Sequence, residues 1–214
     1  MMKNYNVNCI EKDALIITGK GDGLLWNKAD VFIDFVSAWD NKKPEKIEFK
    51  ALWDNVNIYF CFKVHDNQIH LDKKNDSFDA IANSDRVELF FRTDAALNPY
   101  YCLEIDPTPR IMDFKAYPGR NFDLDWKWPK KDLLVKSQIE KNQFTVEIAI
   151  SIASLKELNL IKDNKIETGI FRAKYYEQEN ATFEPVWISW INPNTETPDF
   201  HTSTAFGVLN LVDK

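Results

Sequence analysis

Residues 47–64 read IEFKALWDNVNIYFCFKV, and their alternation sets the class of fold. Apolar side chains occupy every second position on either side of a polar turn at residues 54–57. Period-two alternation is typical of a half-buried strand, and two such runs around a polar turn predict a β-hairpin. The residues expected on its inner face are Ile47, Phe49, Ala51, Trp53, Ile58, Phe60, Phe62 and Val64.

The same alternation recurs further along the chain, at residues 87–91, 101–105, 111–115 and 144–150. Clusters of Pro, Gly, Asn and Asp separate these runs, as at residues 106–109. Many short strands with such punctuation favour an all-β fold. We therefore expect an antiparallel β-sandwich of the jelly-roll type.

One segment departs from this pattern and predicts a single short helix. Ile152, Leu155 and Leu158 follow Ser151 at intervals of three residues, and serine is a favoured N-cap residue. No internal repeat, low-complexity tract or shift in composition divides the chain. One domain over residues 1–214 is therefore expected, with residues 66–84 as an ordered loop at its rim.

Length and charge exclude several classes of function. The chain has 214 residues, with 27 basic and 33 acidic side chains and a net charge of -6. No basic cluster is longer than a pair such as Lys130-Lys131, which argues against a nucleic-acid partner. No apolar run reaches the length of a membrane span, and the first residues do not resemble a signal peptide. The cellular location stays open.

Metal ligands show no dedicated spacing in this sequence. Cys9, Cys61 and Cys102 fit neither a zinc motif nor a disulfide framework, so we interpret them as free thiols. Calcium could be held by oxygen-rich loops, although these lack the spacing of a dedicated calcium loop. The acids concerned are Asp66, Asp72, Asp76 and Asp79.

Strand parity predicts a polar outer face. With Val87 and its alternate neighbours turned inward, Glu88 points outward, and Glu104 does the same on the next strand. Arg172 would join them if Phe171 points to the core. Mixed charges of this kind can grip vicinal hydroxyl groups. The alternative is a solvated sheet with cross-strand ion pairs.

The closing segment, residues 187–211, combines two strand-like ends with an aromatic loop. The loop would hold Phe200 and His201 at a sheet rim, where binding residues are common. The alternative is a plug that covers the end of the core. Trp187 and Trp190 have opposite parity, so one should be buried in the core and the other should lie at the surface or rim.

Several blocks occur in order along almost the whole chain: Gly19-Lys20-Gly21-Asp22 with Trp26, Leu52-Trp53-Asp54, Asp85-Arg86-Val87-Glu88-Leu89-Phe90, Tyr101-Cys102-Leu103-Glu104-Ile105-Asp106, Val146-Glu147-Ile148-Ala149-Ile150, and Ser189-Trp190 through Phe206-Gly207. Together they resemble the family 9 carbohydrate-binding modules and their family 9-like relatives. The resemblance implies a β-sandwich that binds saccharides, usually without cleaving them, and often carries structural calcium.

The family's xylanase-attached members clamp a sugar ring between two tryptophans. By this resemblance Phe200 takes the place of one tryptophan, and the other falls near Ala82. The resemblance matches Glu88 to the acidic hydrogen-bonding position and Glu104 to a basic one. Side chains that could complete the clamp or the polar contacts are Phe78, Trp126, Trp128, Arg172 and His201.

The expected function is therefore non-catalytic binding of a mono- or oligosaccharide derived from plant polysaccharide such as xylan. That binding would support carbohydrate catabolism, in association with glycoside hydrolases and without a required cofactor. Two alternatives stay open. One is a glycoside hydrolase that uses Glu88 and Glu104 as paired carboxylates, and the other is a protein-interaction module that binds no sugar.

Overall fold

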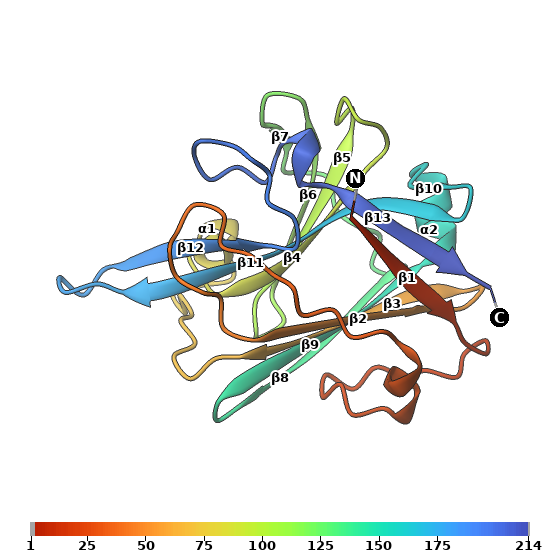
Figure 1. Cartoon of the computed structure of the whole chain (residues 1–214), viewed down its shortest axis with the longest axis horizontal. Coiled ribbons are helices and arrows are strands. Elements are labelled where there is room, and N and C mark those ends of the chain that lie inside the picture. The colour runs from red at the N-terminus through yellow and green to blue at the C-terminus, as the bar shows by residue number, and fades with distance from the viewer. Residues whose placement is uncertain (1–2, 214) are drawn as a thin grey trace.

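The computed structural model describes residues 3–213 and is built mainly of strands (Figure 1). The strands are β1 (Asn4–Cys9), β2 (Ile47–Trp53), β3 (Asn57–His65), β4 (Arg86–Arg92), β5 (Tyr100–Ile105), β6 (Ile111–Tyr117), β7 (Asn121–Asp123), β8 (Leu133–Glu140), β9 (Gln143–Ser151), β10 (Ile161–Lys162), β11 (Lys165–Glu177), β12 (Phe183–Ser189) and β13 (Gly207–Val212). The helices are α1 (Phe78–Ala82) and α2 (Ile152–Glu157), with 3₁₀ turns η1 (Leu24–Lys28) and η2 (Ser203–Ala205). The predominantly β class predicted above is confirmed.

The strands form one continuous mixed sheet in the order β7-β6-β5-β4-β11-β13-β1-β2-β3-β9-β8, with β10 and β12 attached to β11. Strand β1 runs parallel to both β13 and β2. The sheet is therefore mixed, and the predicted antiparallel jelly-roll sandwich is not confirmed. Alternation of apolar residues shows on which face of a sheet a side chain lies. It does not show whether a partner strand, such as β13 beside β1, runs parallel or antiparallel.

The sheet curls so that its two halves face each other across the main core. The half that contains β4, β5 and β11 lies over the half that contains β2, β3 and β9 (Figure 1). Phe60 of β3 and Phe91 of β4 meet across the core, with ring centroids 6.2 Å apart. The predicted hairpin is present as β2 and β3, closed by the bond from Asp54 N to Asn57 O. Each fully buried side chain of this size contributes about 1.5–3 kcal/mol.

A second apolar layer covers the outer face of β4, β5 and β11. Phe90 and Phe171 of these strands pack there against Phe200 and Phe206 from the segment between β12 and β13. The outer face that was predicted to be polar is therefore mostly covered by apolar side chains. Polar groups under this layer, such as Glu88, are buried rather than solvated, whereas Glu177 at the end of β11 is exposed.

The predicted helix is present as α2, and Ser151 caps it by accepting a 3.0 Å hydrogen bond from Ser154 N. A second helix, α1, lies inside the segment predicted as a loop. Helix α1 has only five residues, too few for a helical apolar period to show in the sequence.

Candidate functional site

The candidate site lies on the outer face of β4, β5 and β11. The register aligns Glu88 with Glu104 of β5 and with Phe171 of β11. Arg86 is aligned with Ala173, which is itself opposite Trp187 of β12. Residues on facing positions of neighbouring strands share one side of a sheet.

A cavity of about 120 Å³ opens at this place, and we call it the site pocket. Its lining combines strand residues with the segment that precedes η2 and with the turn between β6 and β7. The lining residues are Arg86, Glu88, Glu104, Arg120, Trp187, Pro198, Asp199, Phe200 and His201. Four of the predicted site residues, Glu88, Glu104, Phe200 and His201, are thus brought together.

A buried charge cluster forms the polar part of the pocket. Nε of Arg86 lies 2.6 Å from Glu104 Oε2 and 2.9 Å from Glu88 Oε1. The single Nε proton is donated to Glu104. Nη1 of Arg86 donates to the carbonyl of Ala82 at 2.6 Å. Within residues 3–213, buried Glu88 Oε1 consequently has no hydrogen-bond partner.

Burial and mutual charge interactions shift the pKa values of Arg86, Glu88 and Glu104. Burial, together with the neighbouring Glu104 carboxylate, raises the pKa of Glu88 to about 8, although Arg86 opposes both effects. Burial also raises the pKa of Glu104, against the lowering effect of Arg86. Although burial lowers the pKa of Arg86, the two carboxylates raise it more. At neutral pH the cluster therefore contains a protonated Glu88, which can both donate and accept a hydrogen bond.

Aromatic rings form the apolar wall. Phe200 is only 6% exposed, because its ring stacks on Phe171 with centroids 4.0 Å apart and planes at 11°. Trp187 meets Phe200 edge-on at 5.7 Å, and the Arg86 guanidinium lies 5.5 Å from the Trp187 centroid. One face of Phe200 is thus already covered, whereas Trp187 stays half-buried. Trp187 is the better placed of the two rings to meet a ligand.

His201 is fixed by aromatic neighbours. Its Nδ1 shares a 2.9 Å hydrogen bond with the Tyr100 hydroxyl, and its ring packs 4.9 Å from Phe122. Burial, with Arg120 and Arg86 nearby, lowers the pKa of His201 to about 3. The imidazole is therefore neutral near pH 7, and its role here is to anchor the segment that carries Phe200.

An exposed ion pair lies at the rim of the pocket. Arg120, in the turn between β6 and β7, lies 3.7 Å from Asp199, with 56% and 31% of the two side chains exposed. Exposed pairs of this kind are weak, about 0–1 kcal/mol. Arg120 can therefore turn toward a ligand at small cost, whereas Asp199 Oδ1 is also held by a 2.8 Å hydrogen bond from His201 N.

The predicted face of Arg172 is wrong. Phe171, not Arg172, shares the face of Glu88, so Arg172 points between the two halves of the sheet. There its guanidinium binds Asp66 and lies over Phe144 at 5.7 Å. Strand β11 carries apolar and polar residues at both parities, and most of it is covered on both faces, so its parity cannot be read from the sequence.

The remaining predicted aromatics lie outside the site pocket. Trp128 is 3% exposed, sits in the main core and donates to Ser154 Oγ at 3.1 Å, so it has no free face. Trp126 packs on Tyr101 with centroids 4.9 Å apart. Phe78 of α1 is covered by the Lys127 ammonium, 4.1 Å from its centroid. None of the three lines the pocket.

The acids predicted for calcium do not form one site. Asp66 forms ion pairs with Arg172 and Lys174. Asp72 accepts a hydrogen bond from Lys74 N within its own turn. In the part of the chain that the structure describes, no three His, Cys, Asp or Glu side chains gather to hold a metal ion. These described residues do not fit a structural calcium.

Five pocket residues were missing from the predicted site, namely Arg86, Arg120, Trp187, Pro198 and Asp199. Arg86 and Trp187 carried a signal, since Arg86 shares the parity of Glu88 and Trp187 was expected on the opposite face from Trp190. Trp190 is fully buried, as one of that pair should be. Arg120 had no signal, because only the tertiary fold brings its turn to the pocket.

Fold and site together define a β-sheet module with a small pocket walled by aromatic rings and floored by ionisable groups. The chain belongs to the family described as carbohydrate family 9 binding domain-like, whose model matches residues 17–214. The resemblance noted in the sequence is thereby confirmed. No curated protein matches the chain at a significant level.

Solved structures of similar fold cover nearly the whole chain. A family 9 carbohydrate-binding module from Caldicellulosiruptor kristjanssonii in complex with glucose has a TM-score of 0.66 and 16% identity, with 99% of this chain and 97% of that chain covered. Its cellotriose complex gives the same TM-score and identity, with 99% and 95% covered. A candidate carbohydrate-binding protein from Bacteroides uniformis ATCC 8492 has a TM-score of 0.74 and 15% identity, with 99% and 100% covered. At these identities the likeness establishes the fold alone. Within residues 3–213, no helix has the length and apolarity of a membrane span.

Proposed function

We propose that this protein binds a saccharide in the site pocket without cleaving it. The observation that carries the proposal is the buried Glu88 carboxyl, whose Oε1 lies 2.9 Å from Arg86 Nε but accepts no hydrogen bond within the described residues, in a pocket walled by Trp187. A buried polar atom without a partner costs free energy, about 1–3 kcal/mol, that a ligand hydroxyl recovers. Family membership and the sugar complexes of the similar Caldicellulosiruptor module support the same class of ligand.

In this proposal, some pocket residues form hydrogen bonds with the saccharide and another stacks on its ring. Glu88 and Glu104 hold hydroxyl groups, and Arg86 keeps both carboxyl groups in place. Trp187 presents a flat ring to the C–H face of a pyranose. Asp199 and Arg120 at the rim reach the outer hydroxyls. In this proposal the saccharide comes from plant polysaccharide such as xylan, and the protein works beside glycoside hydrolases in carbohydrate catabolism.

Isothermal titration calorimetry with glucose, xylose, galactose, mannose and their β-linked oligomers tests the proposal. We expect binding by the wild-type protein and a loss of about two- to tenfold in Glu88→Gln, because a hydrogen bond of the neutral carboxyl group is worth about 0.5–1.5 kcal/mol. Glu140→Gln, on an exposed end of β8, is the matched control and should bind like the wild type. Failure of every sugar to bind, or an unaffected Glu88→Gln, would show the proposal to be wrong.

Hydrolysis is the second candidate, and one observation favours it. The pKa of Glu88 is raised to about 8 beside a second carboxylate, which is the state that a general acid requires. It ranks second because both carboxyl groups are engaged by the same Arg86 nitrogen. Release of nitrophenol from aryl glycosides, abolished in Glu88→Gln, would move it to first place.

A further inference from the structure

The hairpin of β11 and β12 projects from the body of the protein beyond the site pocket (Figure 1). Along β12, residues 187, 185 and 183 face the same side of the sheet as residues 173, 175 and 177 of β11. Trp187 of the site pocket is therefore followed, on one face of the hairpin, by Pro185 and then Phe183. The distance along the strand from Trp187 to Phe183 is about 13 Å.

A second cavity, of about 440 Å³, lies at the Phe183 end of this face, and we call it the hairpin pocket. Its volume falls within the range typical of small-molecule sites, about 300–1,000 Å³. Its lining combines three aromatic rings, three polar side chains and two aliphatic side chains. The lining residues are Gln68, Ile69, His70, Leu71, Lys73, Tyr175, Glu177 and Phe183.

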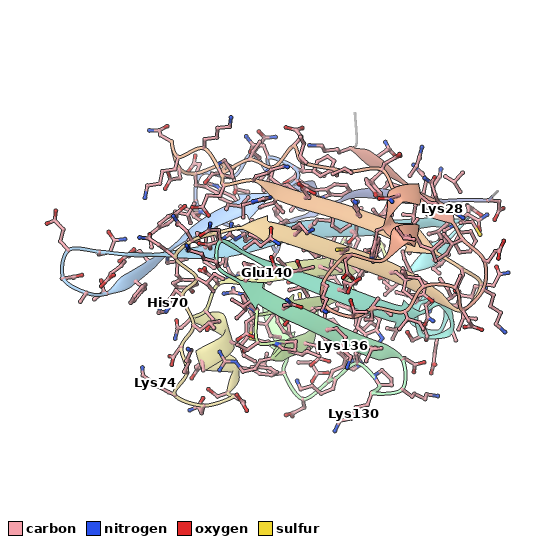
Figure 2. The ribbon with its side chains drawn as sticks, turned by 90° about the horizontal axis from the view of Figure 1, so that it is seen from below. Lys28, His70, Lys74, Lys130, Lys136 and Glu140 are labelled. Atoms are coloured by element: carbon pink, nitrogen blue, oxygen red, sulfur yellow. The ribbon has the colours of Figure 1, made fainter. Side chains whose placement is uncertain are left out.

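Stacked rings form one wall of the hairpin pocket. His70 stacks on Phe183 with centroids 3.7 Å apart and planes at 21°, and Tyr175 lies 5.7 Å from His70. Phe183 remains 40% exposed, and Figure 2 shows His70 where the hairpin leaves the body. Burial lowers the pKa of His70, so its ring is mainly uncharged at neutral pH. Two neutral rings held in this way make a preformed platform for the apolar face of a ligand ring.

The two pockets adjoin each other. The Tyr175 hydroxyl, in the hairpin pocket, donates to the carbonyl of Ala82 at 2.5 Å. Nη1 of Arg86, in the site pocket, donates to the same oxygen at 2.6 Å. The end of α1 thus forms a narrow ridge between the pockets, and the half-buried Pro185 of β12 continues the surface beside it. A single pyranose cannot reach both rings, whereas a trisaccharide can.

We propose that the hairpin pocket is a second saccharide subsite, which binds a further neutral pyranose of an oligosaccharide whose end residue occupies the site pocket. The proposal rests on the proposed function. Phe183 and His70 supply the stacking surface, and Gln68, Lys73 and Glu177 lie within the lining to hold hydroxyl groups. The lining carries both signs of charge, which suits a neutral sugar rather than an ionic ligand.

A peptide strand is the less suitable occupant. A peptide that adds to an exposed sheet edge needs a row of free backbone donors. Pro185 interrupts that row on β12, because proline has no N–H. An extended ligand here must be held by side chains, as an oligosaccharide is.

Calorimetric titration of matched sugars tests the subsite. The probes are glucose with cellotriose, xylose with xylotriose, and mannose with mannotriose, each titrated into the wild type, Phe183→Ala and Glu88→Gln. In the wild type we expect at least one trisaccharide to bind about three- to tenfold more tightly than its monosaccharide, the usual worth of one aromatic stacking contact. Phe183→Ala should remove this advantage and leave monosaccharide binding unchanged, whereas Glu88→Gln should weaken both.

Leu134→Ala is the control, because Leu134 is a 50% exposed apolar side chain on the distant strand β8. Amide chemical shifts of His70 and Phe183 should move with the trisaccharide and not with the monosaccharide. If Phe183→Ala binds trisaccharides like the wild type, the subsite is wrong and the site pocket stands. If no sugar binds the wild-type protein, both the subsite and the proposed function are wrong.

Discussion

Glu88 has an environment unlike that of a free carboxyl group. It is 1% exposed and lies beside Glu104 on the next strand. It accepts no hydrogen bond from Arg86 Nε, because that N–H donates to Glu104. Its pKa in the folded protein, about 8, lies above the ordinary value of 4.5. The native protein therefore keeps this proton over a pH range in which the unfolded chain has lost it.

This difference predicts a pH-dependent stability. The contribution of Glu88 to the free energy of unfolding is complete below about pH 4.5 and is lost as the pH rises to about 8. We expect Glu88→Gln to flatten the fall in stability between these two pH values, because glutamine does not titrate. Urea unfolding at a series of pH values measures the slope, with Glu140→Gln as the exposed control. Parallel curves for the wild type and Glu88→Gln would contradict the assignment.

At the scale of an element, the loop of residues 18–26 is joined to β9 through one buried carboxylate. Glu147 of β9 is 1% exposed and accepts hydrogen bonds from Thr18 N at 2.8 Å and from Trp26 Nε1 at 2.6 Å. Gly19 also donates its N–H to Glu147. A side chain at Gly19 would meet the backbone of Ser137 at 2.7 Å, and its φ is +91°, so glycine is required there.

Glu147→Ala should release this segment. The Trp26 indole and two backbone N–H groups would be left without their acceptor, at a cost of at least about 2 kcal/mol. We expect faster amide hydrogen exchange at residues 18–26 and earlier proteolysis within residues 10–29, while β3 and β9 stay protected. Glu140→Ala, at the exposed end of β8 (Figure 2), should leave both measurements unchanged. Uniform exchange across the whole sheet would mean that the segment does not open locally.

At the scale of the whole molecule, a buried charge network joins the two halves of the curled sheet. Asp66 follows β3 and binds Arg172 of β11, and Lys174 lies 2.9 Å from Asp66 and 3.0 Å from Asp85. All four side chains are at most 1% exposed. Removing one partner from such a network leaves a buried charge with less compensation.

Arg172→Met should therefore lower the free energy of unfolding by about 3–5 kcal/mol. The double variant Arg172→Met with Asp66→Asn should lose less than the sum of the two single changes, because the residues interact directly. Lys46→Met, which breaks the partly exposed pair with Glu48, is the control and should cost no more than about 1 kcal/mol. Equal costs for the buried and the exposed pair, measured by urea unfolding, would contradict a clamping role.

Much of the local structure could be predicted from the sequence, because side-chain periodicity is a local property. Alternation predicted β2, β3, β4, β5 and β9, and with them the shared outer face of Glu88 and Glu104. Ser151 and the spacing after it predicted α2. The ordered blocks along the chain indicated the family that the family model then matched.

Other features depend on pairings between distant segments, which leave no period in the sequence. The parallel position of β1 between β13 and β2 joins the two ends of the chain. The inward direction of Arg172 follows from a strand that is covered on both faces. The meeting of Arg120 with Asp199 and the closure of Phe200 by Phe171 arise only when separate segments fold onto one face.

By itself, then, the sequence determined the predominantly β class, the faces of the regular strands and the family. Each of these follows from the order of side chains within short segments. Only the tertiary structure decided that the polar outer face is roofed, that Trp187 rather than Trp128 lines the pocket, and that Glu88 keeps its proton. The physical reason is burial: desolvation and the loss of partners are set by which distant segments cover a residue, and local pattern does not encode them.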